Sequence, residues 1–89
     1  MKVQTVPSHL TDRAVLNAKP QPNRYKISDD YGLYLLVMPK GSKHWRFDYR
    51  FAGARRTFSI GPYPLFSLAE ARDERDKARK LLRDGIDPG

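Results

Sequence analysis

The clearest pattern in the chain is an alternation of aromatic and polar residues between positions 44 and 51. The aromatic positions are Trp45, Phe47, Tyr49 and Phe51, and the polar positions between them are His44, Arg46, Asp48 and Arg50. A period of two places the aromatic side chains on one face of a β-strand and the polar side chains on the other. We expect the aromatic face to be hydrophobic core rather than a platform for stacking bases, because apolar residues of neighbouring segments share it.

Residues 24–28, 32–38 and 55–60 are predicted to be further strands of the same antiparallel sheet. Turn residues separate the strands: Asp29 to Gly32, Pro39 to Ser42, and the pair Ala52-Gly53. By alternation, Leu33, Leu35, Val37, Phe58 and Ile60 join the aromatic face, and Tyr34, Leu36, Arg55, Thr57 and Ser59 fall on the opposite face. The segment Gly61-Pro62-Tyr63-Pro64 is expected to end the last strand.

A short helix is predicted near the start of the chain. Thr11 suits its N-cap. Its small apolar face consists of Leu10, Ala14, Val15 and Ala18. Pro20 and Pro22 prevent the helix from continuing.

A long helix is predicted near the end of the chain. Ser67 and Glu70 form a capping box at its start, and Gly85 followed by Ile86 predicts a Schellman stop. Its apolar stripe consists of Leu68, Ala71, Ala78, Leu81 and Leu82. Since this is the only long apolar stripe, the helix is predicted to cover the aromatic face of the sheet.

These elements predict an α+β fold: a small antiparallel sheet of three to four strands packed on one carboxy-terminal helix, with a short amino-terminal helix. The 89 residues suffice for one small domain. Residues 1–9 are predicted to be a flexible arm and residues 10–86 the folded domain. Residues 87–89, Asp-Pro-Gly, are predicted to start a linker toward domains outside this chain.

The distribution of charge points to a polyanionic partner. The formal net charge is +7, and residues 40–60 alone hold six Lys and Arg against one Asp. A basic surface concentrated in the predicted sheet favours nucleic acid. The absence of cysteine excludes disulfides and thiolate metal sites, and it is typical of a reducing cytoplasm. The longest apolar run, Leu33 to Met38, is far shorter than a bilayer span, so we expect no membrane partner.

No catalytic constellation is visible. The chain has no cysteine nucleophile, no paired-histidine spacing and no glycine-rich phosphate loop. The carboxylates Asp73, Glu74 and Asp76 alternate with Arg and Lys, which is typical of a solvated helical face. We therefore expect no catalytic residue, metal, cofactor or small-molecule substrate.

The candidate binding residues are those of the polar sheet face and its rim. They are Tyr34, His44, Arg46, Arg50, Arg55, Thr57 and Ser59, with Lys40 and Lys43 at the preceding turn. Arginine binds guanine edges and phosphates bidentately, and a small sheet can enter the major groove. The alternative is an ordinary solvated sheet face. Asp48 fits a DNA-binding face only if it pairs with an arginine or accepts from cytosine.

Several segments, taken in order, resemble the arm-type DNA-binding domain of phage and genomic-island integrases, which are tyrosine recombinases. The matching segments are residues 10–12, 30–35, 37–45, 49–50, 61–64, 67–72 and 85–88. The resemblance implies a sheet that docks in the major groove of arm-type attachment-site DNA. Leu36 departs from the family, whose members often carry a basic residue there, and this puts the contribution of the second strand in question.

The resemblance also implies that the parent protein cuts and rejoins DNA through a tyrosine nucleophile that lies outside this chain. The chain itself is then not an enzyme. Its expected partners are duplex DNA, other integrase protomers and accessory DNA-bending proteins, in the bacterial cytoplasm at the nucleoid. Two alternatives remain: a protein–protein interaction module that contacts integrase protomers or accessory factors, and an RNA-binding domain. A steep salt dependence separates the first from DNA binding, and competition between duplex DNA and duplex RNA separates the second.

Overall fold

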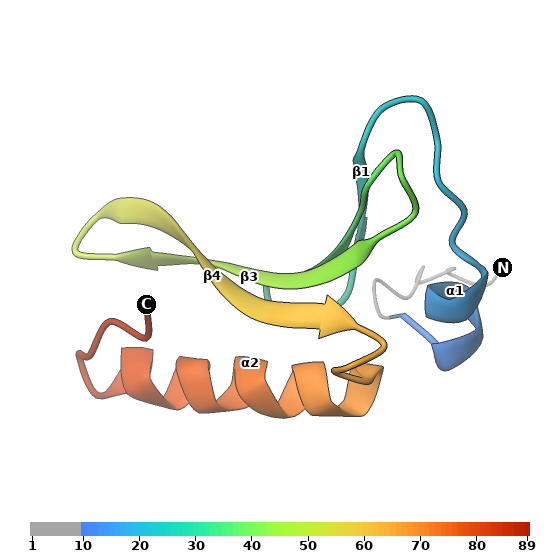
Figure 1. Ribbon diagram of the computed structural model, residues 1–89. Helices are drawn as coiled ribbons and strands as arrows, with labels where there is room; N and C mark the ends of the chain where they lie inside the picture. Colours follow the sequence, from blue (N-terminus) through green and yellow to red (C-terminus); the bar gives the residue numbers. More distant parts are fainter. Residues whose placement is uncertain (1–9) are drawn as a thin grey trace, which may run out of the picture.

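The computed structural model describes residues 10–89, so the arm predicted at residues 1–9 lies outside the described residues. The elements are α1 (Asp12–Asn17), β1 (Tyr25–Ser28), β2 (Leu33–Val37), β3 (Lys43–Phe51), β4 (Ala54–Tyr63) and α2 (Leu68–Arg83). The strands form one antiparallel sheet in the order β1-β2-β3-β4, and α2 runs along one face of it (Figure 1). The predicted α+β architecture is confirmed. In this described part of the chain, no helix is long and apolar enough to cross a membrane.

The hairpin of β3 and β4 is longer than the rest of the sheet and projects beyond it (Figure 1). β2 pairs with β3 only as far as Phe47, so residues 48–57 form a two-stranded ribbon. Its turn has Ala52 at φ 53° and Gly53 at φ 80°. Positive φ at both central residues is typical of a type I′ turn, whose twist matches that of the flanking strands.

The last strand continues past the point where we expected it to end. β4 runs to Tyr63, not to Ile60, because a bulge lets pairing resume after Ile60. Ser59 pairs with Arg46 and Gly61 with Trp45, so Ile60 is the extra residue. A Cβ at Gly61 would lie 2.4 Å from the Phe66 ring, which explains why glycine occupies this position.

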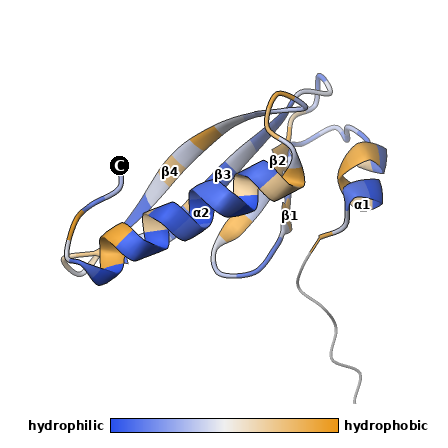
Figure 2. Cartoon of the chain, turned by 90° about the horizontal axis from the view of Figure 1, so that it is seen from below, coloured by the Kyte–Doolittle hydropathy of each residue, from blue (hydrophilic) through white to orange (hydrophobic). Residues whose placement is uncertain are grey.

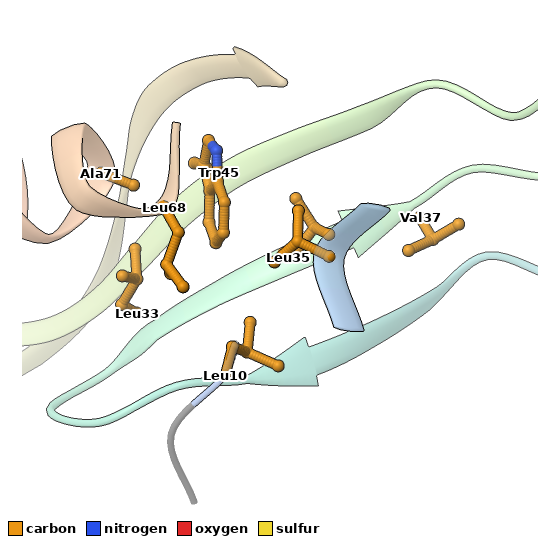
Figure 3. Close-up of a cluster of buried hydrophobic side chains, with 8 residues drawn as sticks. Leu10, Leu33, Leu35, Val37, Trp45, Leu68 and Ala71 are labelled. Atoms are coloured by element: carbon orange, nitrogen blue, oxygen red, sulfur yellow. The ribbon is translucent and has the colours of Figure 1, made fainter. Parts of the chain in front are cut away.

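The aromatic face is core, as predicted. Trp45 is fully buried among apolar residues of the sheet, the segment before α1, and α2 (Figure 3). Its indole Nε1 donates to the Phe66 carbonyl at 2.8 Å. A second, smaller cluster further along the hairpin joins Phe47 and Tyr49 to Ala78 of α2. The first cluster contains Leu10, Val15, Leu33, Leu35, Val37, Trp45, Leu68 and Ala71.

Both helices begin as predicted, but their buried faces differ from expectation. Thr11 caps α1, and Ser67 and Glu70 form the capping box of α2. The end of α2 is a Schellman motif, since Ile86 N–H donates to Leu81 and Gly85 N–H to Leu82. Ala14 and Leu81 were assigned to apolar helix faces, but both are exposed. Leu36 was assigned to the polar face of the sheet, but it is buried. Leu36 is in register with Lys26 and His44, whose side chains flank it on both sides.

The largest departure from expectation is a buried carboxylate that organises α2. Asp29 has a fully buried side chain and accepts hydrogen bonds from Arg72 Nε and Nη2, both at 3.0 Å, and from Arg75 Nη1 at 3.1 Å. Leu10 N–H donates to the same carboxylate at 2.7 Å. Arg75 is buried within the stripe that packs on the sheet. The charged residues of α2 are therefore not simply a solvated face, because two of them neutralise Asp29.

The segment after α2 lies against the hairpin. Asp87 accepts a hydrogen bond of 2.5 Å from the Tyr49 hydroxyl, and its other oxygen lies 3.6 Å from Arg56 Nε. That bond is the first cause of a raised pKa at Tyr49. Residues 87–89 are thus held beneath the ribbon, and the linker expected to start there stays a prediction.

Candidate nucleic-acid interface

The face of the sheet that points away from α2 holds most of the predicted binding residues. Directly paired residues of antiparallel strands share a face. Pairing aligns Ser28, Tyr34, Arg46 and Ser59 in one row, Asp48 and Thr57 in the next, and Arg50 and Arg55 in the third. We call this surface the outer face; it brings together Tyr34, His44, Arg46, Arg50, Arg55, Thr57 and Ser59.

Arg50 and Arg55 face each other next to the hairpin turn. Like charges directly opposite each other on two strands repel. Arg55 Nη2 lies 3.9 Å from Asp48 Oδ2, but 74% of the Arg55 side chain is exposed, so this ion pair contributes little. The Arg50 side chain has no hydrogen bond or ion pair with any residue in the range 10–89. A bound anion would relieve the repulsion between these two guanidinium groups.

Asp48 lies at the centre of the outer face and changes its chemistry. Its Oδ1 accepts a hydrogen bond of 2.8 Å from the Thr57 hydroxyl, and its Oδ2 faces Arg55. Asp48 therefore pairs with an arginine, which is one of the two conditions under which we expected it to fit a DNA-binding face. Thr57 is engaged by this carboxylate, so a contact from its hydroxyl to DNA requires that hydroxyl to turn away from Asp48.

Arg46 is half-buried in the middle of the sheet, between Tyr34 of β2 and Ser59 of β4. Its Nε is buried and has no hydrogen-bond partner among the described residues. A buried donor without a partner costs about 1–3 kcal/mol. A ligand would offset this cost only if the Arg46 side chain turned so that Nε could donate to it.

The two lysines predicted at the rim are placed differently from each other. Lys40 is exposed in the turn between β2 and β3, at the end of the sheet away from the hairpin tip. Lys43 is on the covered face, where its Nζ donates to the carbonyls of Val15 at 2.7 Å and Leu16 at 3.0 Å. A cation at the last carbonyls of a helix stabilises it. Lys43 thus holds α1 in place, and we leave it out of the interface.

Lys26 of β1 belongs to the outer face and was missed. It is in register with Leu36, and its Nζ lies 4.9 Å from the centre of the Tyr34 ring. The signal was available, because Tyr25 and Ile27 point to the core and alternation sends Lys26 to the other side. The same rule places Lys43 with Trp45, two positions later.

The outer face has the chemistry of a binding surface. Burial raises the pKa of Tyr34, and the neighbouring Asp48 raises it further. Across residues 10–89, no group of three or more His, Cys, Asp and Glu could hold a metal ion. What the surface offers is guanidinium and ammonium groups beside short hydroxyls. These groups bind phosphates and base edges.

Comparison with known proteins gives a consistent result. Residues 10–89 match the model of a family described as Arm DNA-binding domain. The integrase of Enterobacteria phage P4 is 47% identical over 81 residues, which cover 89% of this chain and 18% of that protein. Prophage integrase IntZ of Escherichia coli (strain K12) is 44% identical over 81 residues, and the integrase of Shigella phage Sf6 is 42% identical over 79, each covering 89% of this chain and 20% of that protein. The chain spans about a fifth of the length of these curated relatives.

Proposed function

The chain belongs to the arm DNA-binding domain family, and from this premise we propose that its outer face binds duplex DNA as a non-catalytic domain of an integrase. The observation that carries the proposal is the row of cations on the outer face. Arg46, Arg50 and Arg55 share that face, and Asp48 is the only carboxylate the described strands place beside them.

The projecting ribbon of β3 and β4 supports entry into the major groove. That groove is about 12 Å wide and admits a two-stranded β-ribbon. Residues 49–56 pair with neither β1 nor β2, and α2 and Asp87 lie only on the other side of the ribbon, so its outer side is open to a groove. Arg50 and Arg55 then lie deepest, where arginine reads guanine bidentately. We expect Lys26 and Lys40, nearer the body of the domain, to contact phosphates.

We further propose that the DNA is an arm-type attachment site and that the parent protein carries out site-specific integration. The names of the relatives support integration, and the arginines at the ribbon tip support sequence reading. We assign chemistry on DNA to parts of the parent protein outside this chain, which spans about a fifth of the length of the integrases it matches.

Fluorescence anisotropy with a labelled duplex tests the proposal. Arg50→Ala and Arg55→Ala should each weaken binding by about 1–3 kcal/mol, and the salt dependence should be steep, with a slope of about −0.9 per phosphate contact. Lys77→Ala is the matched control, since it removes one exposed cation from α2. Equal losses in all three variants would contradict the outer-face assignment. Salt-insensitive self-association in place of DNA binding would favour the protein–protein alternative.

A further inference from the structure

A second cationic surface lies on the flank of α2, away from the outer face. Arg75, Asp76, Arg79, Lys80 and Arg83 line an open cavity of about 590 Å³ together with Tyr31. Arg75, Arg79 and Arg83 are four residues apart, so they share one side of the helix. Figure 2 shows the hydrophilic outward side of α2, on the helix side of the sheet.

Tyr31 is held at this cavity by a strained turn. It has φ 60°, a left-handed conformation that non-glycine residues rarely adopt, and Gly32 follows with φ 88°. Gly32 cannot carry a side chain, because its Cβ would lie 2.4 Å from the Asp48 carbonyl. Such strain persists where the surrounding structure imposes it. The turn leaves Tyr31 64% exposed beside the α2 cations.

The cations of this flank differ in what neutralises them. Arg75 is bound by Asp29 and Asp76, and Arg83 lies 3.3 Å from Asp84. Arg79 and Lys80 have no carboxylate partner among residues 10–89. The Arg79 guanidinium lies 4.1 Å from the centre of the Tyr31 ring. A guanidinium stacked on a ring keeps its N–H edges available to an anion.

We propose that this flank is a second DNA-binding site, which takes the phosphate backbone of a second duplex. Arg79 and Arg83 are about 6 Å apart along the helix axis, with Lys80 beside them, so the cations form a row that suits the successive phosphates of a DNA strand better than a single small anion. A straight duplex seated on the outer face cannot also reach the helix side of the sheet. The inference rests on the proposed function, and it makes the domain a bridge between two DNA segments.

A capture experiment separates this inference from the proposed function. One unlabelled duplex of mixed sequence is fixed to a surface, the chain is bound to it, and retention of a fluorescent duplex from solution is measured. The wild-type chain should retain the second duplex. Arg79→Ala combined with Lys80→Ala should lower that retention by about tenfold while leaving capture by the first duplex unchanged. Arg79→Lys should lose part of the retention, because an ammonium cannot stack as a plane, and Lys77→Ala should lose none.

Each remaining outcome is decisive. Normal capture without retention of a second duplex overturns the inference and leaves the proposed function standing, whereas no capture at all overturns both. If the Arg79→Ala/Lys80→Ala variant loses capture by the first duplex as much as retention of the second, the two duplexes use the same site and the inference is overturned. The inference is also overturned if light scattering finds two copies of the chain in each bridged complex, because the outer faces of two chains would then account for the bridge.

Discussion

Arginine serves two purposes on the two sides of this sheet. On the helix side, Arg72 and Arg75 converge on the buried Asp29 at 3.0 to 3.1 Å. On the outer side, Arg46 and Arg50 have no carboxylate partner among the described residues, and Arg55 has only Asp48 at 3.9 Å. The residue type is the same, but the first set neutralises a buried carboxylate of the fold, and we propose that the second set binds DNA.

The number of cations on an element therefore does not locate a binding surface. Residues 67–89 hold six Lys and Arg, as many as residues 40–60. What separates Arg72 and Arg75 from the arginines of the outer face is the buried carboxylate of Asp29 within hydrogen-bond distance.

Trp45→Ala should have the largest effect. The indole is fully buried next to Arg46, which faces the other way, and truncating a buried aromatic side chain costs about 3–5 kcal/mol. Urea unfolding followed by circular dichroism measures the loss. DNA affinity should fall only in proportion to the unfolded fraction. A variant of unchanged stability that no longer binds DNA would move the interface to the aromatic face.

Asp29→Ala should come next, at about 3 kcal/mol, because it leaves Arg75 buried without its main partner. Asp84→Ala, which removes an exposed carboxylate from Arg83, should cost less than about 1 kcal/mol in the same urea titration. If the two variants are equally stable, the Asp29 network does not hold α2 to the sheet.

The same carboxylate should give the domain a pH-dependent stability. Burial raises the pKa of Asp29, but hydrogen bonds from Arg72 and the Leu10 N–H, with the charge of Arg72, outweigh it and leave the pKa below 3.8. The unfolded chain therefore takes up this proton first as the pH falls. The contribution is present above about pH 4 and is lost as the pH falls through the folded pKa. Stability curves of the wild type and Asp29→Asn should converge there; parallel curves would refute the account.

Asp48→Asn should have the smallest effect, and the opposite sign. An amide oxygen can still accept from Thr57, while the charge that repels phosphate and attracts Arg55 is gone. Affinity for duplex DNA should rise by about 0.5 kcal/mol at low salt, as measured by anisotropy. Weaker binding would instead mean that Asp48 itself accepts from a base or positions Arg55.

Much of this contrast could be read from the sequence, because local rules set it. Alternation over residues 44–51 assigned Trp45 and Arg46 to opposite faces, and both capping motifs of α2 lie within a few residues. The Asp29 network could not be read, since its partners are 43 and 46 residues away in the chain. The bulge at Ile60 was also hidden, because it depends on how Phe66 packs over Gly61.

The most direct test of the central claim, that the outer face binds duplex DNA, is an NMR titration of the isotope-labelled chain with less than one equivalent of duplex. The account predicts the largest amide shifts at Arg46, Arg50, Arg55 and Ser59, with little change at Arg72 and Arg75 in the Asp29 network. Shifts concentrated on α2 with an unperturbed hairpin would contradict it.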